Sequence, residues 1–392
     1  MTSGGGASNV AILATLDTKR AEAEHLARVL EAEGIDAVLL DMTPDHVLRG
    51  QRSAERGETM SRAAAAIRDT VVRAAAQDGL AGIVALGGAS GAALAAGALT
   101  ALPYGTPKVL VSPIASGDTR PYVGASDVVT LHPVIDFIGR NRYVDSVLER
   151  AAHILIGMLR SPVPAATPHE DVGITAFGVT SPLVDVLRER LGGVGRHAVC
   201  FSANGAGGAG FEGFVRAGRF GSVIDATISE LADELFGGVL SAGRDRLTAA
   251  AERRVPQIVL PGAADFLNFG PESQVPASMR DRPIIRHTPS VTLVRTTPAE
   301  NEQLGAFVGE RLRDAPATVV VPTQGYSLVS APGAPFADRA ADDAFLAGLR
   351  TQLPEHRIRL VDAPINDDRV ADEVMTAWSE LVDGSPTAAS DQ

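Results

Sequence analysis

Short apolar segments alternate with longer amphipathic segments along most of the chain. Near-continuous runs of Val, Ile, Leu and Ala predict buried strands, and apolar residues three or four apart predict helices between them. In the first half, strands are predicted at residues 10–15, 37–41, 82–86 and 108–112, and helices at 19–33, 60–76, 92–102 and 144–159. Strands that are apolar on both faces and alternate with helices are typical of a parallel sheet covered on both sides.

A second series of the same kind follows a proline-rich segment. Residues 161–170 contain three prolines and no periodicity, which predicts a linker. Beyond it, strands are predicted at 172–177, 198–201, 222–227, 257–260, 318–321 and 358–362, and helices at 182–191, 211–217, 244–253, 298–312, 338–353 and 367–381. The pattern therefore predicts two tandem α/β domains, at 9–160 and 171–382, with flexible tails at 1–8 and 383–392.

The composition disfavours nucleic-acid and membrane partners. Of 392 residues, 35 are Lys or Arg and 47 are Asp or Glu, so the net charge is −12 and disfavours nucleic acid as a partner. Cys200 is the single cysteine, which excludes an intrachain disulfide, fits a reducing cytoplasm and is expected to be a small buried hydrophobe. No apolar run of 18 residues and no signal-peptide pattern occurs, so no membrane partner is expected. Glycine is enriched, at 40 residues, and its positions carry the best clues.

The first glycine loop lies between a predicted strand and a predicted helix. It reads Leu86-Gly-Gly-Ala-Ser-Gly-Ala92. Unhindered N–H groups of Gly87, Gly88 and Gly91, together with the helix N-terminus, can bind an anion, although a plain tight turn fits as well. Ser90 is an alternative nucleophile, but the loop narrowly misses the Gly-x-Ser-x-Gly pattern.

Two more polar segments follow strands of the first domain. Ser116, Gly117 and Asp118 come after the fourth strand, where the first two could bind phosphate or ribose and Asp118 could bind Mg²⁺. The alternative is an Asx-type turn.

Thr15, Asp17 and Lys19 come after the first strand. They either cap the following helix or contact a nucleotide, with Lys19 on a phosphate and Asp17 on a sugar hydroxyl or metal.

In the second domain a longer glycine loop, Gly205–Gly210, follows the predicted strand at 198–201. Gly205, Gly207 and Gly210 match G-x-G-x-x-G, and Asp225 lies 20 residues after Gly205, the nominal spacing for a dinucleotide site. Because the loop follows the second strand of its domain rather than the first, a loop for another ligand is preferred. Gly205, Gly207 and Gly208 are therefore predicted to contact a substrate.

Polar side chains elsewhere in the second domain are candidates for catalysis. Glu230 and Asp233 would share a helix face and could act as acid and base or hold a metal, although Thr227 and Glu230 also fit a capping box. Asp265 and Asn268 follow an apolar strand and could orient a ligand or cap a turn.

Arg286 and His287 precede another apolar run. Arg286 could bind a carboxylate or phosphate, and His287 could transfer a proton or be structural. No HxH or HExxH pattern suggests a zinc site.

These motifs together resemble the Tm-1-like ATP-binding family, the UPF0261 group, over about residues 9–382. The resemblance is carried by the segments 12–19, 86–91, 116–118, 121–124, 230–235, 237–238, 261–262, 268–270, 286–287 and 292–297, and by Asn141. It implies two tandem Rossmann-like subdomains with mostly parallel sheets and ATP in the first. It places these residues near the nucleotide: Thr15, Asp17, Gly87, Gly88, Ser90, Gly91, Ser116, Gly117 and Asn141. One departure is that Ser202 and Ala209 stand where relatives tend to have His and Arg.

The leading hypothesis is a cytoplasmic, ATP-binding enzyme, with Mg²⁺ as a possible cofactor. A small-molecule substrate would bind in the inter-domain cleft against the second-domain loop, Glu230, Asp265 and His287. The reaction would be ATP-dependent activation of a small acid, or a hydrolysis regulated by ATP. The alternatives are a nucleotide-responsive binding or regulatory protein without turnover, a serine hydrolase using Ser90 or Ser202, and an NAD(P)-binding enzyme. A homo-oligomer is expected.

Overall fold

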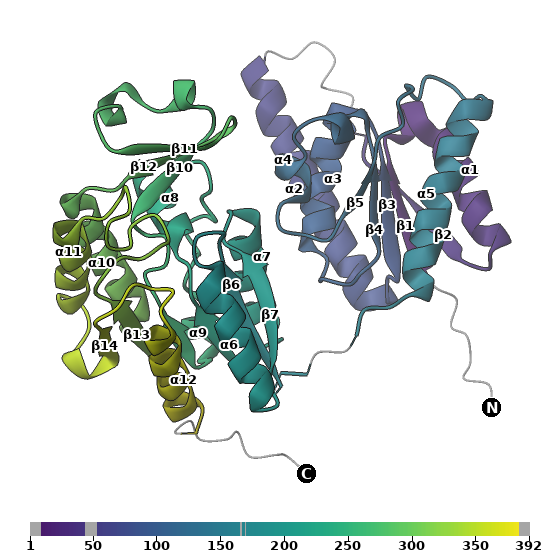
Figure 1. Ribbon diagram of the computed structural model, residues 1–392. Coiled ribbons are helices and arrows are strands. Elements are labelled where there is room, and N and C mark those ends of the chain that lie inside the picture. The colour runs from purple at the N-terminus through teal and green to yellow at the C-terminus, as the bar shows by residue number, and fades with distance from the viewer. Residues whose placement is uncertain (1–8, 44–52, 165–166, 169, 384–392) are drawn as a thin grey trace. The chain divides into compact units, whose positions relative to one another are not determined.

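The computed structural model describes residues 9–43, 53–164, 167–168 and 170–383. The chain divides into two compact units, Met1–Pro164 (unit 1) and Ala165–Gln392 (unit 2) (Figure 1). The division lies inside the predicted 161–170 linker. The predicted tails at 1–8 and 383–392 lie outside the described residues, except for Asp383, which is the last residue of a helix.

Unit 1 contains one sheet of five parallel strands. Their order across the sheet is β2-β1-β3-β4-β5. The strands are β1 (Asn9–Ala14), β2 (Asp36–Asp41), β3 (Gly82–Leu86), β4 (Lys108–Val111) and β5 (Val129–Leu131). Every residue of β3 and β4 is buried, which accounts for their apolar sequences. The exception is Lys108, whose buried ammonium pairs with Asp127 (2.6 Å). The edge strand β2 is partly exposed.

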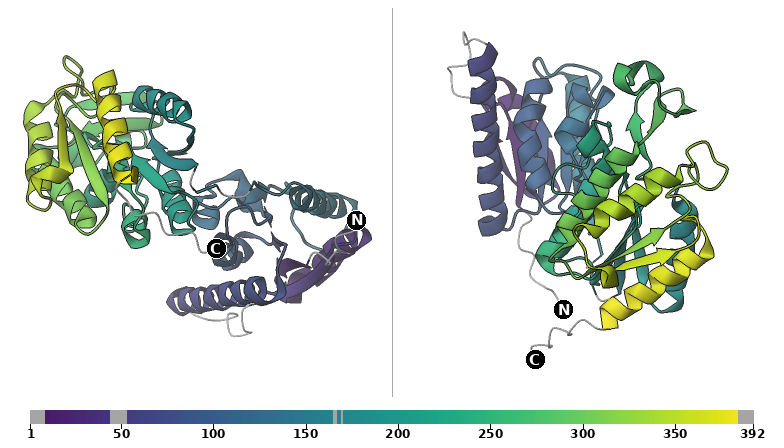
Figure 2. Two further views of the ribbon diagram at one scale, coloured as in Figure 1. Left: turned by 90° about the horizontal axis from the view of Figure 1, so that it is seen from below. Right: turned by 90° about the vertical axis from the view of Figure 1, so that its left-hand side faces the viewer.

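Helices cover both faces of this sheet (Figures 1 and 2). One face packs on α1 (Leu16–Ala32) and α5 (Arg142–Arg160), and the other on α2 (Ser53–Asp78) and α3 (Ala89–Ala101). The β4–β5 connection contains η2 (Pro113–Ser116) and α4 (Arg120–Val123). Because β1 leads to a helix on one face and β3 to a helix on the other, the carboxyl ends of these neighbouring strands form the position where open α/β sheets bind ligands.

Unit 2 contains a larger parallel sheet, ordered β14-β13-β9-β8-β6-β7. Its strands are β6 (Asp171–Ala176), β7 (His197–Ser202), β8 (Ser222–Asp225), β9 (Gln257–Val259), β13 (Ala317–Pro322) and β14 (Ile358–Val361). One face packs on α6 (Ser181–Gly193) and α12 (Asp368–Asp383). The other packs on α7 (Ala206–Arg216), α8 (Ser229–Phe236), α9 (Ala249–Arg253), α10 (Pro298–Leu312) and α11 (Arg339–Arg350). A short η5 (Glu355–Arg357) precedes β14.

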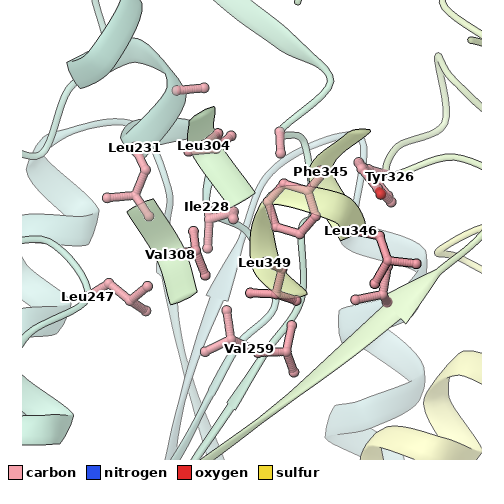
Figure 3. Packing of buried hydrophobic residues seen from close by; sticks show 14 of the residues in the cluster. Ile228, Leu231, Leu247, Val259, Leu304, Val308, Tyr326, Phe345, Leu346 and Leu349 are labelled. Carbon is pink, nitrogen blue, oxygen red and sulfur yellow. The ribbon is translucent and has the colours of Figure 1, made fainter. Parts of the chain in front are cut away.

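The largest apolar core of unit 2 lies between its sheet and three of these helices. Figure 3 shows Leu231 of α8, Val308 of α10 and Phe345 of α11 gathered near Val259 of β9. All four are at most 1% exposed. The tandem Rossmann-like α/β fold is thus confirmed, with a separate apolar core in each unit.

An antiparallel sheet interrupts unit 2 between β9 and α10 (Figure 1). Its order is β10-β12-β11, with β10 (Phe266–Phe269), β11 (Ile284–Thr288) and β12 (Val291–Arg295). The β10–β11 connection contains η3 (Glu272–Gln274) and η4 (Ala277–Met279). This sheet is absent from the sequence-based prediction, which expected only an apolar segment near Val291.

Two sequence-based expectations are wrong. The predicted helix at 244–253 forms only at Ala249–Arg253, because the Arg246 side chain turns into the core and Leu247 adopts a positive φ of 68°. Cys200 is exposed on the edge strand β7 rather than buried. Among the described helices, none is both long and apolar enough to cross a membrane.

Candidate functional site

The N-terminus of α3 carries the most open glycine loop of unit 1. Gly88 is the N-cap residue in an extended conformation, and no side chain of the described residues caps the helix. Gly87 donates its N–H to Val111 of β4, and the first bond of the helix runs from Ala92 to Gly88. The N–H groups of Gly88, Ala89 and Ser90 therefore have no hydrogen-bond partner among the described residues, and all three residues are exposed. Free amides at a helix N-terminus are suited to bind an anion.

Gly87 and Gly88 differ in whether the loop itself leaves room for a side chain. A Cβ at Gly87 would lie 2.9 Å from the Cα of Gly91, so the loop itself demands glycine there. A Cβ at Gly88 would meet nothing within 4 Å, and its φ of −68° is open to any residue. Gly88 therefore leaves space beside the N-terminus of α3 that a ligand close to the backbone could occupy.

The N-terminus of α1, at the end of β1, is occupied by the protein itself. Leu16 donates its N–H to Asp41 Oδ1 (2.9 Å), and Asp17 donates its N–H to Thr43 Oγ1 (3.3 Å). The Thr15 hydroxyl bonds the Thr18 hydroxyl (3.0 Å) and does not cap the helix.

Lys19 lies in the first turn of α1, where its backbone leaves the helical conformation. Its ammonium donates to the carbonyl of Phe137, in the segment after β5. Asp17 remains exposed.

The β4 loop holds its predicted residues in a self-contained turn. The Ser116 hydroxyl donates to the Pro113 carbonyl (2.9 Å), and the Gly117 amide donates to Ile114 (3.0 Å). Both oxygens of Asp118 accept from the Arg120 guanidinium, at 2.9 and 2.7 Å. Arg120 lowers the pKa of Asp118 to about 2. A metal at Asp118 would have to displace this arginine.

Asn141 caps a helix. Its Oδ1 accepts from the N–H groups of Tyr143 (3.0 Å) and Val144 (3.1 Å) at the start of α5. Its amide nitrogen has no hydrogen-bond partner among the described residues, so a nucleotide contact is compatible with the cap.

The unit 2 glycine loop is closed from inside the protein. Glu230 Oε1 accepts from the N–H groups of Gly205 (2.6 Å) and Gly208 (3.0 Å), at the N-terminus of α7. A Cβ at Gly208 would lie 2.0 Å from Glu230 Oε2, and one at Gly207 would lie 1.8 Å from the Ser202 carbonyl. These glycines are required by packing within the chain, and their role in substrate binding stays a prediction.

Glu230 belongs to a buried ion cluster around Arg246. The guanidinium donates to Glu230 Oε2 (2.7 Å), to both oxygens of Asp225 (2.5 and 2.6 Å) and to Glu212 Oε1 (3.1 Å). Arg246, Asp225 and Glu230 have no exposed surface. Burial raises the pKa of Glu230, and Arg246 opposes that effect. Both Glu230 oxygens are thus engaged, and the capping box predicted with Thr227 is wrong because Ile228 is the N-cap of α8.

The cluster occupies both carboxylate oxygens of Asp225. Asp225 cannot present its carboxylate to a ribose, which counts against the dinucleotide interpretation of the Gly205 loop. Arg246 and Glu212 could not be predicted as members of the cluster, since neither stands in a recognisable sequence motif.

Asp233 holds the antiparallel sheet to α8. Its oxygens accept from the Asn268 backbone N–H (2.9 Å), the Asn268 side-chain amide (3.1 Å) and the Leu240 N–H (3.0 Å). Burial raises the pKa of Asp233 to about 6, although these hydrogen bonds oppose the effect. Asp233 and Asn268 therefore contact each other, a pairing that the sequence did not indicate.

Asp265 lies in a second buried polar group at the start of β10. Its Oδ2 accepts from the Ser327 hydroxyl (2.6 Å), and its carbonyl accepts from Arg295 (2.9 Å), which also donates to Asp342 (3.0 Å). Burial raises the pKa of Asp265, and it raises that of Asp342 to about 7. Asp265 is fully buried, so a substrate could not reach its carboxylate in this conformation.

Arg286 and His287 lie on β11, away from that group. Both are exposed, and Arg286 forms an ion pair with Glu272. His287 makes no hydrogen bond to any described residue. The four predicted catalytic residues therefore occupy at least three separate environments in unit 2.

The geometry gives little support to a metal site or to a serine nucleophile. In the part of the chain that the structure describes, no three His, Cys, Asp or Glu side chains are grouped to hold a metal. Neither Ser90 nor Ser202 bonds a described histidine or carboxylate, as an activated nucleophile would.

Comparisons with known proteins place the chain in a family. Residues 43–164 match the N-terminal domain, and residues 169–382 the C-terminal domain, of "Uncharacterised protein family (UPF0261)". The chain belongs to the UPF0261 family. A UPF0261 protein from Clostridium tetani (strain Massachusetts / E88) is 36% identical over 390 residues, covering 92% of this chain and 96% of that protein. One from Rhizobium meliloti (strain 1021) is 34% identical, covering 94% and 98%.

A plant protein is also similar. The ToMV resistance protein Tm-1(GCR237) of Solanum lycopersicum is 35% identical over 316 residues, which cover 78% of this chain but 42% of the tomato protein. The Tm-1-like resemblance is thereby confirmed. Among solved structures, a C2-type ketoreductase from a modular polyketide synthase is 17% identical, with a TM-score of 0.24 over 97% of this chain and 90% of that one; a likeness so weak carries no argument.

Proposed function

We propose that this UPF0261 protein binds ATP through unit 1, with the phosphates at the N-terminus of α3. The observation that carries the proposal is the N-terminus of α3, where the amides of Gly88, Ala89 and Ser90 have no partner among the described residues and a Cβ at Gly88 would meet nothing within 4 Å. The sheet order supports it, because Gly88 follows β3 at the position where the strand connections change face. Lys19 and Asn141 would add donors, and Mg²⁺ would accompany the triphosphate.

Calorimetry with MgATP tests the proposal on three proteins. Gly88→Val is expected to weaken binding by about tenfold or more, because its side chain would enter the space above the amides. Gly157→Val, an exposed glycine of α5 that also has open space around it, is the matched control and is expected to bind as wild type does. The proposal fails if wild type does not bind millimolar MgATP, or if Gly88→Val binds as tightly.

Two functions are candidates for a protein that binds ATP through unit 1: an enzyme, and a nucleotide-responsive binding protein. An enzyme of ligase or hydrolase type needs accessible acids and bases. Because Glu230, Asp233 and Asp265 are buried and hydrogen-bonded, the second candidate, a nucleotide-responsive binding protein without turnover, gains support. Incubation of ATP with small carboxylic acids, followed by phosphorus NMR, separates the two: product formation would exclude the binding protein.

A cytoplasmic location and a homo-oligomeric state complete the proposal. The net charge of −12 and the single cysteine agree with a reducing, aqueous compartment. Light scattering of the purified chain would determine its mass in solution, and a monomer would contradict the expected oligomer.

A further inference from the structure

Among the sheet edges that the structure describes, all but β7 are protected against pairing with another chain. β5 has three residues, and β14 has four and carries Arg359, which pairs with Glu373 and Glu380 of α12. The outer side of β10 is covered, since Val239 donates its N–H to Asn268. β11 shifts register within its length, and β2 has an aspartate at each end. Short strands, charges and bulges are usual ways in which proteins block edge pairing.

β7 has none of these protections (Figure 1). Its six residues pair with β6 in unbroken register and include no Pro, Asp, Glu, Lys or Arg. Because His197 at the start of the strand donates its N–H to Glu170, the alternation of a parallel ladder turns the backbone groups of every second residue away from β6. These residues are Ala198, Cys200 and Ser202. Their N–H groups have no hydrogen-bond partner among the described residues.

A groove of about 380 Å³ lies beside this open edge, between β7 and α6. Ala198 and Cys200 of β7 line one side of it, and Val184, Asp185 and Arg188 of α6 line the other. Asp185 and Arg188 pair with each other (3.3 Å), and their side chains are 71% and 56% exposed. The surface therefore offers one charge of each sign next to a strand that lacks a neighbour.

We propose that β7 pairs with β7 of a second copy of this chain, antiparallel and centred on Cys200, so that the two six-stranded sheets become one. This inference rests on the proposed homo-oligomer and names its interface. A twofold axis through Cys200, perpendicular to the sheet, sets Ala198 opposite Ser202 of the second copy. All the outward-facing backbone groups then find partners, and no like charges face each other across the strands.

The charges of α6 favour a second copy as the partner. The same twofold axis keeps α6 of both copies on one face of the joined sheet and sets the two helices antiparallel, side by side. Asp185 of each copy then lies toward Arg188 of the other, so the exposed pair on one chain is complementary to the same pair on the next. The surface is thus complementary to itself.

Cross-linking with a short bismaleimide tests the pairing on the full chain. Cys200 is the single cysteine and is exposed, so a covalent dimer forms only where two Cys200 thiols lie close together. Residues opposite each other in an antiparallel pair have Cβ atoms about 5 Å apart, within reach of the reagent. Wild type is expected to give a covalent dimer on a denaturing gel, at a yield that does not fall on dilution. Cys200→Ser should give none.

Light scattering of two lysine variants tests the same edge without a reagent. Cys200→Lys sets two ammonium groups against each other at the twofold axis and is expected to halve the mass of the wild-type particle. Leu360→Lys is the matched control, because Leu360 is 45% exposed on β14, the opposite edge strand of the same sheet. It should keep the wild-type mass. Trp378 fluorescence checks that unit 2 of each variant is folded.

The outcomes separate this interface from the oligomer itself. If wild type is a monomer, both the expected homo-oligomer and the inference fail. If wild type is an oligomer but gives no covalent dimer, the oligomer uses another surface and the inference alone fails, whatever Cys200→Lys does. It fails also if folded Cys200→Lys keeps the wild-type mass. Should Cys200→Lys not fold, the cross-linking of wild type decides.

Discussion

The two glycine loops at helix N-termini differ in what occupies their amides. At α3 of unit 1 the amides of Gly88, Ala89 and Ser90 are exposed and have no partner among the described residues. At α7 of unit 2 the amides of Gly205 and Gly208 donate to the buried carboxylate of Glu230. Two loops with similar composition therefore differ: the amides of one are left to solvent, and those of the other bind a carboxylate of the chain itself.

The space around a glycine of each loop differs in the same way. Adding a Cβ at Gly208 would collide with Glu230, whereas adding one at Gly88 would enter empty space. The fold explains a glycine whose Cβ position is blocked, as at Gly208. The open space at Gly88 matters because it lies beside amides that no described residue bonds. The comparison can be tested first at the closed loop, where the expected effects are largest.

Arg246→Met should have the largest effect. It keeps a long side chain but removes the cation from Glu212, Asp225 and Glu230, and breaking such a buried group costs about 3–5 kcal/mol. Trp378, the single tryptophan, is in unit 2 and buried, so its fluorescence during denaturant unfolding measures the free energy of unfolding of that unit.

Arg244→Met is the matched control for this experiment. Arg244 lies two residues away, and its side chain is 93% exposed. It should change the free energy of unfolding by less than about 0.5 kcal/mol. If both variants behave alike, the cluster does not hold unit 2 together and the closed loop needs another explanation.

Asp233 should contribute to the pH dependence of unit 2, together with Asp342, whose pKa is raised to about 7. The pKa of Asp233 is about 6 in the fold, against an ordinary value of 3.8. The folded state therefore binds this proton more tightly than the unfolded state does. The resulting stabilisation is fully present below about pH 4, and about 3 kcal/mol of it is lost as the pH rises through 6.

Asp233→Asn isolates this contribution. The variant cannot titrate at this position, so the difference in free energy of unfolding between it and wild type should shift by up to about 3 kcal/mol in its favour between pH 4 and pH 7. Tryptophan fluorescence again reports on unit 2. A constant difference between the two proteins across this range would show that the Asp233 pKa is not raised.

The two loop glycines give the most direct comparison. Gly208→Ala should destabilise unit 2 by about 1–3 kcal/mol, because the added methyl group overlaps Glu230. Gly88→Ala should leave stability within about 0.5 kcal/mol of wild type while weakening MgATP binding. Stable Gly208→Ala together with unstable Gly88→Ala would reverse the assignment of closed and open loops.

Much of the fold could be predicted from the sequence because the signal is local. The buried strands β3 and β9 and the helix α10 appear within a residue or so of their predicted positions, since apolar runs and helical spacing act over short distances. The antiparallel sheet was missed because its short strands were hidden among turn residues.

The candidate site was less predictable because its chemistry depends on contacts between distant residues. The Glu230 carboxylate reaches Gly205 across 25 positions, and Arg246 reaches Asp225 across 21. No short motif encodes such pairs, so the helical spacing at 244–253 gives no sign that the Arg246 side chain turns into the core.

The smallest effect is expected at Asn141, where unit 1 also uses a side chain to close a helix N-terminus. Asn141→Ala removes the cap of α5 and should cost unit 1 about 1 kcal/mol, whereas Asn141→Asp keeps an equally good capping oxygen and should cost only a few tenths. The loss is measured from far-UV circular dichroism during denaturant unfolding, with Trp378 fluorescence following unit 2 separately. If Asn141 also contacts the nucleotide through its amide nitrogen, Asn141→Asp should weaken MgATP binding with little loss of stability, because a carboxylate then replaces the amide donor. Normal binding by Asn141→Asp would leave Asn141 as a helix cap alone, as Glu230 is in unit 2, and would confine the open site to α3 and its neighbours.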